Sequence, residues 1–311
     1  MRTSIHLRGV NLKIIRPYDF VPFLRYIPYN GGKIEHKEGK IPIRVKTLTP
    51  IHISSGEYVV DYKSIVYKEF IKVNDGPVIP ATSLKGCIRS IAESISNSYL
   101  YIYDKKRNKL IPEWKIKLYN DSGKKAGENK TKGQNKEEKI KCIVCDMFGQ
   151  MGQKSKVLIS DLKGIDNKYR LEIKGIPPSF GPNPENEYYL ENGKYKGYKF
   201  YRHGINGIQP KGNIFCEFVT EDSWFEGEII YRNLTEDQMQ LLCFSLGLSG
   251  DFNPKIGYGK NYFYGSIEVT SDDKWVEKAN QYKINSNPGV RKNIDILTSI
   301  LSFKNALRTL E

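Results

Sequence analysis

Residues 79–86, with the sequence IPATSLKG, place small hydroxyl side chains ahead of a basic pair. Thr82 or Ser83 is suited to cap a helix, because short hydroxyl side chains are favoured at a helix start. The free N–H groups and positive dipole end of such a helix suit a phosphate, and Lys85 and Arg89 add charge one turn apart. The segment predicts a phosphate contact, although an ordinary capped helix with two solvated basic residues explains the same pattern.

A second segment, GYGKN at residues 257–261, is rich in glycine and follows Lys255. Glycine lets the backbone approach a phosphodiester, and a tyrosine such as Tyr258 is able to stack on a base. Lys255 and Lys260 would neutralise the phosphate. A dinucleotide fingerprint is rejected, because this segment does not follow a strand and open a helix. A tight hairpin turn is the alternative explanation.

Cys142 and Cys145 form a CxxC pair, which supplies half of a tetrahedral zinc site. The chain has no second CxxC, so a structural Zn²⁺ would need a distant ligand such as Cys87 or His203. The thioredoxin-like context of a redox pair is missing. Structural zinc and plain packing thiols both stay open as interpretations.

Carboxylates follow the first predicted strand, at Glu57, Asp61 and Glu69. A carboxylate in such a loop is able to orient a ribose 2′-hydroxyl, or to hold Mg²⁺ or another divalent cation, for RNA cleavage. Solvated loop acids fit the same positions. The acids therefore predict either catalysis or a polar loop.

Two of the four histidines lie in segments with other candidate residues. His52 belongs to TPIHISSG, and His203 follows Arg202 within KFYRH. An imidazole is able to hydrogen-bond RNA or to act as a general base. No Ser/His/Asp or Cys/His arrangement has an identifiable spacing, so no nucleophilic triad is predicted.

A mixed α+β fold must position these segments. Residues 41–53 begin with the alternation of a half-buried strand, and Thr235 with Gln238 forms a capping box that opens a helix. Further elements are predicted as strands at 156–162 and 169–173, a β-hairpin at 213–219 and 226–232, a closing strand at 263–269 and a final helix at 291–310. Without insertions the order is β-α-β-β-α-β, a ferredoxin-like or RRM-like core with long insertions.

Composition limits the class of protein and of partner. The 311 residues include 49 Lys and Arg against 35 Asp and Glu, a formal net charge of +14, with 39% hydrophobic side chains. Such a chain folds, and its charge favours a polyanion as partner. Residues 104–141 alone carry 13 basic and 6 acidic side chains.

The sequence also indicates a compartment. No apolar stretch reaches the roughly 18 residues that a membrane-spanning helix needs. No secretory leader is recognised, and the five cysteines are an odd number. We therefore expect a cytoplasmic protein without membrane contact.

Taken in order, the motifs resemble the RAMP superfamily of CRISPR-associated proteins. The resemblance is carried by LTPIHISSG at 48–56, IPATSLKGCIR at 79–89, CxxCxMFG at 142–149 and GYGKNYFYG at 257–265. Residues 17–22 (PYDFVP) and the KFYRH segment are similar to a RAMP subgroup of type III systems, in particular subtype D. The resemblance covers most of residues 15–270 and indicates a backbone subunit of a type III effector complex.

The resemblance implies a division of the chain into an N-terminal extension over residues 1–40, a RAMP domain over 41–270 with insertions at about 104–141 and 176–212, and a C-terminal helical segment over 271–311. The domain is implied to grip a CRISPR guide RNA, with target RNA and other effector subunits as partners. A hairpin of such subunits displaces a base of the guide–target duplex, and either insertion is a candidate for it.

The motifs and the resemblance together predict RNA contacts by His52, Ser83, Lys85, Arg89, Arg202, His203, Lys255, Tyr258 and Lys260. Related subunits cut target RNA with an Asp in the loop after the first strand. Here Lys63 occupies that position, and Asp61 lies two residues away. Two alternatives to a binding subunit stay open: an endoribonuclease that uses Asp61, or a guide-processing endonuclease that uses His52 or His203.

Overall fold

The computed structural model describes residues 4–7, 10–13, 16–102, 108–118, 142–150, 152–179, 181, 183–205 and 208–307. Most of the predicted insertion at 104–141, including its lysine-rich part, lies outside the described residues. Within the described ranges, no helix is long and apolar enough to cross a membrane.

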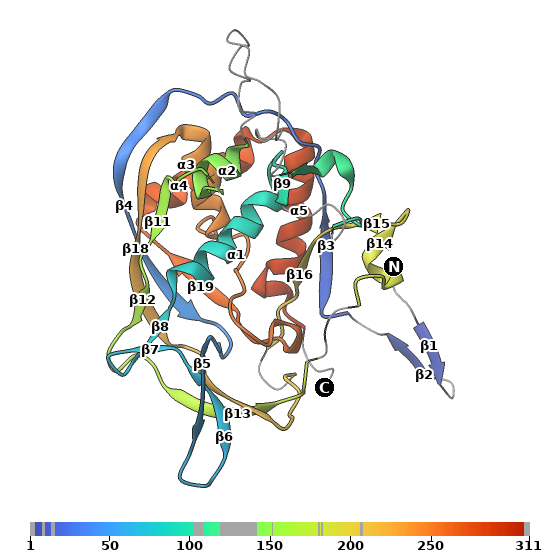
Figure 1. The fold of residues 1–311 in the computed structure, drawn as a ribbon, viewed down its shortest axis with the longest axis vertical. Coiled ribbons are helices and arrows are strands. Elements are labelled where there is room, and N and C mark those ends of the chain that lie inside the picture. Colours follow the sequence, from blue (N-terminus) through green and yellow to red (C-terminus); the bar gives the residue numbers. More distant parts are fainter. Residues whose placement is uncertain are drawn as a thin grey trace, which may run out of the picture.

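A seven-stranded sheet forms one side of the molecule (Figure 1). Its order is β19–β4–β18–β12–β8–β7, and β11 pairs with a separate stretch of β18. The strands are β4 Ile34–Thr47, β7 Lys72–Val73, β8 Gly76–Ile79, β11 Val157–Ile159, β12 Leu162–Gly164, β18 Trp224–Thr235 and β19 Ile267–Thr270. The alternation predicted for β4 is confirmed, because Ile41, Ile43 and Val45 are buried while Pro42 and Arg44 are exposed.

Helices cover one face of this sheet (Figure 1). α1 Ala81–Ser94 contacts α3 Glu236–Ser245, and both pack on strands of the sheet. The other helices are α2 Ile143–Phe148, α4 Asp273–Asn285 and α5 Pro288–Leu301. In this sheet, β19 lies on one side of β4 and β18 lies on the other side. This order is consistent with the predicted ferredoxin-like core.

A second sheet has four strands in the order β13–β17–β6–β5. They are β5 Ser54–Val60, β6 Val66–Phe70, β13 Leu171–Ile176 and β17 Ile214–Val219. The predicted hairpin of residues 213–219 and 226–232 is wrong, because β17 belongs to this sheet and β18 to the first. Where the chain passes from β17 to β18, Thr47 Oγ1 donates to the Thr220 carbonyl at 2.7 Å and accepts from the Ser223 N–H at 2.9 Å.

β3 Tyr18–Pro22 and β16 Gly197–Tyr201 form an antiparallel ribbon beside α5. Parts of the predicted extension (1–40) and of the predicted insertion (176–212) thus lie side by side, with Val21 fully buried. The predicted boundary at residue 40 falls within β4. The final helix predicted at 291–310 instead begins at Pro288, where Asn287 caps it, and ends at Leu301.

Short elements complete the chain. They are β1 Ser4–Leu7, β2 Val10–Lys13, β9 Leu100–Ile102, β10 Ile116–Leu118, β14 Leu190–Glu191 and β15 Lys194–Tyr195, with 3₁₀ turns at Glu113–Lys115, Glu187–Tyr189, Lys260–Tyr262 and Phe303–Asn305.

The two predicted helix starts have different outcomes. The capping box of Thr235 and Gln238 is confirmed at the start of α3. For α1 the predicted hydroxyl cap is wrong: Pro80 is the N-cap residue, and the Asp161 carboxylate accepts from the Ala81 N–H at 2.7 Å. A carboxylate that is distant in the sequence therefore already accepts a hydrogen bond from the first N–H of α1.

Asp146 joins α2 to α3 and to the chain before β11. Its Oδ2 accepts from Gln238 Nε2 at 2.7 Å and from Lys156 Nζ at 2.6 Å. Its Oδ1 accepts from Gln153 Nε2 at 3.1 Å. The Gln238 side chain is fully buried and depends on this carboxylate for its hydrogen bond, whereas Gln153 and Lys156 are only partly buried.

Replacing Asp146 with alanine should lower the free energy of unfolding by about 2 kcal/mol, because it leaves the buried Gln238 amide without this acceptor and removes the ion pair with the partly buried Lys156. Asp295→Ala is the control, since its ion pair with Lys283 is exposed and should contribute less than about 0.5 kcal/mol. Urea denaturation measures both. An equal loss of unfolding free energy in the two variants would contradict the structural role given to Asp146.

Candidate nucleic-acid interface

Three segments that are far apart in the sequence line one cleft of about 470 Å³. They are the first turns of α1, strand β16 and the loop at residues 255–260. The lining residues are Thr82, Ser83, Gly86, Cys87, Ser90, Ile91, Lys199, Phe200, Tyr201, Lys255, Ile256, Gly257, Lys260 and Leu301. The predicted RNA contacts Ser83, Lys255 and Lys260 therefore lie at the same cleft.

The wall formed by α1 has small side chains. Thr82, Ser83, Gly86 and Ser90 lie along it. A Cβ added at Gly86 would meet no heavy atom within 4 Å. Glycine inside a helix costs about 1 kcal/mol relative to alanine, and packing does not require it here. The space at Gly86 is thus open to a ligand.

Lys85 and Arg89 have different surroundings. Lys85 Nζ donates to Ser155 Oγ at 3.0 Å, and burial followed by the charge of Arg89 lowers its pKa. Arg89 forms an ion pair with Glu93 at 2.9 Å and donates to the Gly149 carbonyl at 2.9 Å. The Arg89 guanidinium therefore ties the end of α2 to α1, and its predicted contact with RNA stays a prediction.

The glycine-rich loop is closed by its own lysines. Gly257 has a φ of +79°, and a Cβ there would lie 2.3 Å from the His52 carbonyl oxygen, so the position requires glycine. Lys255 Nζ is buried and donates to the Arg202 carbonyl at 2.9 Å and to the Lys260 carbonyl at 3.3 Å. Lys260 Nζ donates to the Gly257 carbonyl at 2.7 Å.

Burial is also what sets the charge of Lys255. Burial, followed by the charge of Lys260, lowers the pKa of Lys255 to about 7. An amine that is buried, bonded to carbonyls and partly neutral at pH 7 shapes the loop and does not present a full charge to a phosphate. The predicted phosphate contact of Lys255 stays a prediction, and Lys260, which is less buried, lines the same cleft.

His203 is also a structural residue. Its Nε2 lies 2.8 Å from the Leu301 carbonyl and 3.0 Å from the Asn253 carbonyl, while Nδ1 lies 2.7 Å from Ser266 Oγ. Carbonyl oxygens only accept, so Nε2 carries the proton and Nδ1 accepts from the serine hydroxyl. The side chain is 1% exposed. The imidazole is thus held by internal hydrogen bonds, and its predicted contact with RNA, or role as a base, stays a prediction.

His52 lies beneath the glycine-rich loop. Its Nδ1–H donates to the Glu217 carbonyl at 2.6 Å, and its ring packs against Phe218 and Tyr258. Burial lowers its pKa, so the ring is neutral, and its buried Nε2 has no hydrogen-bond partner among the described residues. His52 packs against the Tyr258 ring, and its predicted contact with RNA stays a prediction.

Arg202 and Tyr258 lie at the margins of the cleft. Arg202 forms an ion pair with Asp19 at 2.6 Å. The hydroxyl of Tyr258 donates to Ser179 Oγ at 3.2 Å, and its ring is half-exposed. Both side chains stay accessible, so their predicted contacts with RNA remain proposals.

Lys199 is a cleft residue that sequence reasoning missed. Its Nζ lies 4.1 Å from the ring centroid of Tyr18, 4.6 Å from that of Tyr189 and 4.9 Å from that of Tyr201. This cluster exists only because β16 pairs with β3. The local signal was a lysine among aromatic residues in GYKFY, which includes Tyr201, but the nearest ring, that of Tyr18, lies far away in the sequence.

Asp61 holds the turn between β5 and β6. Its Oδ1 accepts from the N–H groups of Lys63 and Ile65, each at 2.8 Å. In the described part of the chain, no group of three or more His, Cys, Asp or Glu side chains is placed to hold a metal ion. The geometry thus gives Asp61 a turn-forming role, and its predicted part in Mg²⁺-dependent cleavage stays a prediction.

The two cysteines of the CxxC motif are buried against α1. A hydrogen bond between the thiols lowers the pKa of Cys142 and raises that of Cys145. The Arg89 guanidinium lies 4.0 Å from Cys145 Sγ. These surroundings do not fit a tetrahedral zinc site unless ligands come from outside the described residues.

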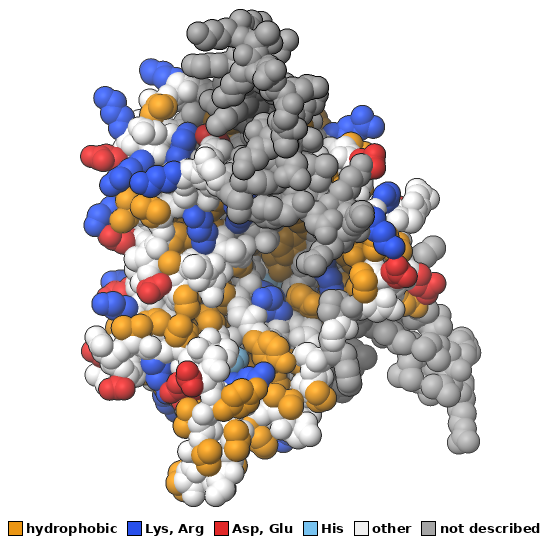
Figure 2. Space-filling view, viewed as in Figure 1, with side chains coloured by type: hydrophobic (Ala, Val, Ile, Leu, Met, Phe, Trp, Pro, Cys, Tyr) orange, Lys and Arg blue, Asp and Glu red, His pale blue; other side chains and the backbone are white. Residues whose placement is uncertain are grey.

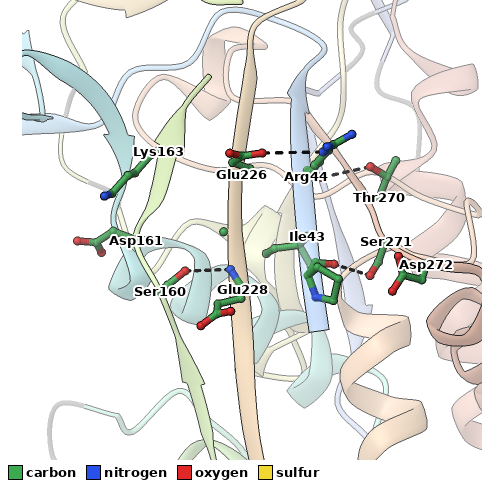
Figure 3. Close-up of a pocket in the computed structure, with 12 residues that line it drawn as sticks. Ile43, Arg44, Ser160, Asp161, Lys163, Glu226, Glu228, Thr270, Ser271 and Asp272 are labelled. Atoms are coloured by element: carbon green, nitrogen blue, oxygen red, sulfur yellow. Dashed lines mark hydrogen bonds and ion pairs between the residues drawn. The ribbon is translucent and has the colours of Figure 1, made fainter. Parts of the chain in front are cut away.

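A second hollow, of about 780 Å³, lies on the sheet face that the helices leave open (Figure 3). Its acidic lining residues are Asp161, Glu226, Glu228 and Asp272, and its basic ones are Arg44 and Lys163. None of its lining residues is aromatic. A surface with more acidic than basic side chains and no stacking ring is poorly suited to RNA.

Comparison with known families finds a match over most of the chain. The RAMP superfamily model matches residues 44–268, which include the start of α1, the CxxC motif, β16 and the glycine-rich loop. No curated protein matches the chain.

The buried His203 should make stability depend on pH. Burial lowers its pKa to about 3, against about 6.5 in the unfolded chain. Its contribution to stability is therefore complete above pH 6.5 and is lost as the pH falls from 6.5 towards 3, because only the unfolded state takes up the proton.

The measurement is urea denaturation between pH 7.5 and 4. In His203→Gln, the free energy of unfolding should be lower at pH 7.5 than in the wild type. It should also fall less between pH 7.5 and 4, because the buried histidine is absent. His36→Gln is the control, because His36 is only partly buried beside Glu236. An unchanged pH dependence in His203→Gln would contradict the neutral, buried imidazole.

Proposed function

Because this chain belongs to the RAMP superfamily, we propose that it is a backbone subunit of a type III CRISPR effector complex, of subtype D, and that it holds the guide RNA. Membership implies a CRISPR-associated, RNA-binding role. The subtype and the position in the complex come from the motif resemblance. Target RNA and the neighbouring subunits are the further partners in this proposal.

The observation that carries the proposal is the convergence of three motifs at one cleft. The start of α1, the glycine-rich loop and β16 are separated by many residues, and they meet around a cleft of about 470 Å³. The hydroxyl side chains of Thr82, Ser83 and Ser90 offer hydrogen bonds to phosphate or ribose. Gly86, where a Cβ would meet no heavy atom within 4 Å, lets a sugar-phosphate chain come close to the protein backbone.

The proposal places phosphate and ribose, rather than base edges, against this cleft. Phosphate contacts hold a strand without reading its sequence. Lys85 and Lys260 lie in or beside the cleft, and neither forms an ion pair with a carboxylate within the described residues. Binding is therefore expected to be nearly independent of sequence and to weaken as the salt concentration rises.

Metal-dependent chemistry has less support in this protein. A nuclease function through Asp61 would need a carboxylate free to hold a cation or a 2′-hydroxyl, and one oxygen of Asp61 is committed to the turn. Cleavage of target RNA with Mg²⁺ and structural zinc on Cys142 and Cys145 stay predictions. We propose binding as the function of this chain.

Gly86→Ala separates binding from stability. Alanine should raise the free energy of unfolding by about 0.5–1 kcal/mol, because glycine is unfavourable inside a helix. The same methyl group should weaken RNA binding by about tenfold, through a clash of roughly 1–2 kcal/mol with the bound strand.

Fluorescence anisotropy with a labelled guide-length RNA measures the affinity, and thermal melting measures the stability. Ser299→Ala is the control, since Ser299 is exposed on α5 away from the cleft. A Gly86→Ala protein that is more stable and binds RNA as tightly as the wild type would contradict the placement of RNA on α1.

Asp61→Ala tests the nuclease alternative. Our proposal expects RNA binding within about twofold of the wild type, and no cleavage by the purified protein with Mg²⁺ in either form. The lost turn bonds should lower the free energy of unfolding by about 1 kcal/mol. Cuts in a complementary target RNA that vanish in Asp61→Ala would instead show an active endoribonuclease subunit.

A further inference from the structure

The hairpin of β5 and β6 projects from the body of the protein (Figure 1). Its register places Tyr58 opposite Lys68 and Val60 opposite Val66. Residues two apart on a strand, and residues opposite each other, share a face of the sheet. These four side chains therefore form one face of the hairpin, and Tyr62 lies at its tip.

This face is unusually exposed for its composition. Tyr62 is 90% exposed, Tyr58 67%, Val60 60% and Val66 54%. Hydrophobic side chains gather over the hairpin at the bottom of the space-filling view (Figure 2). Contiguous apolar surface of this kind marks an interaction site on a folded protein.

Each exposed ring has an ammonium group beside it. Lys63 Nζ lies 5.3 Å from the centre of the Tyr62 ring. Lys68 Nζ lies 5.9 Å from the centre of the Tyr58 ring and 5.5 Å from that of Tyr258. Among the ion pairs of the described residues, neither lysine is paired with a carboxylate. The face thus offers flat rings together with positive charge that has no internal counter-ion.

The same face is continuous with the proposed RNA cleft. Lys68 connects the hairpin to Tyr258, which follows Gly257 of the cleft lining. The Tyr258 ring in turn packs on His52. A strand that leaves the cleft over the glycine-rich loop therefore meets Tyr258, then Tyr58, then Tyr62.

We propose that this face, which we call the hairpin stripe (Tyr58, Val60, Tyr62, Lys63, Val66, Lys68 and Tyr258), stacks the unpaired bases of a single-stranded RNA segment. The inference rests on the proposed function, since it adds base contacts to a strand whose phosphates lie in the cleft. Bases stack on aromatic rings in a sequence-tolerant way, and the adjacent lysines neutralise the phosphates between them.

RNA fits this face better than a protein partner does. A protein that covered the apolar side chains would have to bury Lys63 and Lys68 or supply carboxylates to both, because burying unpaired charges is costly. A single RNA strand brings bases for the rings and phosphates for the lysines together. The continuity with the cleft favours the same ligand.

The test compares two probes of equal length: a 16-nucleotide RNA that contains 2-aminopurine, and a chain of abasic ribose phosphates. Replacing Tyr58 and Tyr62 with alanine should weaken binding of the RNA by about tenfold and leave binding of the abasic chain unchanged. The quenching of 2-aminopurine fluorescence on binding should be lost as well. Replacing both tyrosines with phenylalanine keeps the rings and should keep affinity and quenching.

Folding is not expected to suffer, because both tyrosine side chains are largely exposed, and thermal melting checks this. Tyr188→Ala is the matched control: an exposed tyrosine with a cationic neighbour, Arg16, outside the stripe. It should bind both probes as the wild type does.

Two results overturn the inference while leaving the proposed function intact. One is equal binding and equal quenching in the wild type and the double alanine variant. The other is unchanged RNA binding together with loss of the variant from the assembled effector complex, which would make the stripe a protein-docking surface. A wild-type protein that binds neither probe overturns the proposed function and, with it, the inference.

Discussion

The buried segment at residues 50–53 is the constraint on which the rest of the structure depends. It follows β4, and its backbone groups bond to both the second sheet and the glycine-rich loop. Its hydrogen-bond partners are Ile71, Val219, Tyr258 and Gly265, at 2.8–3.0 Å. Buried backbone groups must be paired, so this segment cannot shift without losing several bonds at once. The position of the loop against α1, and with it the cleft, follows from that tie.

This arrangement explains why two cationic side chains near the cleft point into the protein. Arg89 is used to hold α2, and Lys255 is used to close the glycine-rich loop. Backbone carbonyls and one carboxylate satisfy them, as buried polar groups require. The surface left for a ligand is then made of hydroxyl groups, glycines and a few accessible lysines.

The sequence allowed the local features of the fold to be predicted, because they depend on neighbouring residues. The alternation in β4 and the capping box at Thr235 are of this kind, and both are confirmed. The cap of α1 was not predictable, since it comes from Asp161, and neither was the separation of β17 from β18 into two sheets. Those features depend on partners that are distant in the chain.

The candidate site also has local features that could be predicted and long-range features that could not. Residue types and order located the segments at the cleft, but not the direction in which each side chain points. His203 and Lys255 are of residue types that bind ligands, yet both side chains are buried and form hydrogen bonds within the protein. Lys199 was missed because its aromatic neighbours come from β3 and from the 3₁₀ turn at Glu187–Tyr189. Burial is set by long-range packing, which a single sequence does not display.

The central claim is that RNA lies on the cleft between α1, β16 and the glycine-rich loop, and the most direct test is photo-cross-linking. Guide RNA that contains 4-thiouridine is irradiated with the intact protein, and the linked peptides are identified by mass spectrometry. The account predicts cross-links within residues 81–90 and 255–262. Cross-links confined to the open sheet face around Arg44 and Lys163, with none at the cleft, would contradict it.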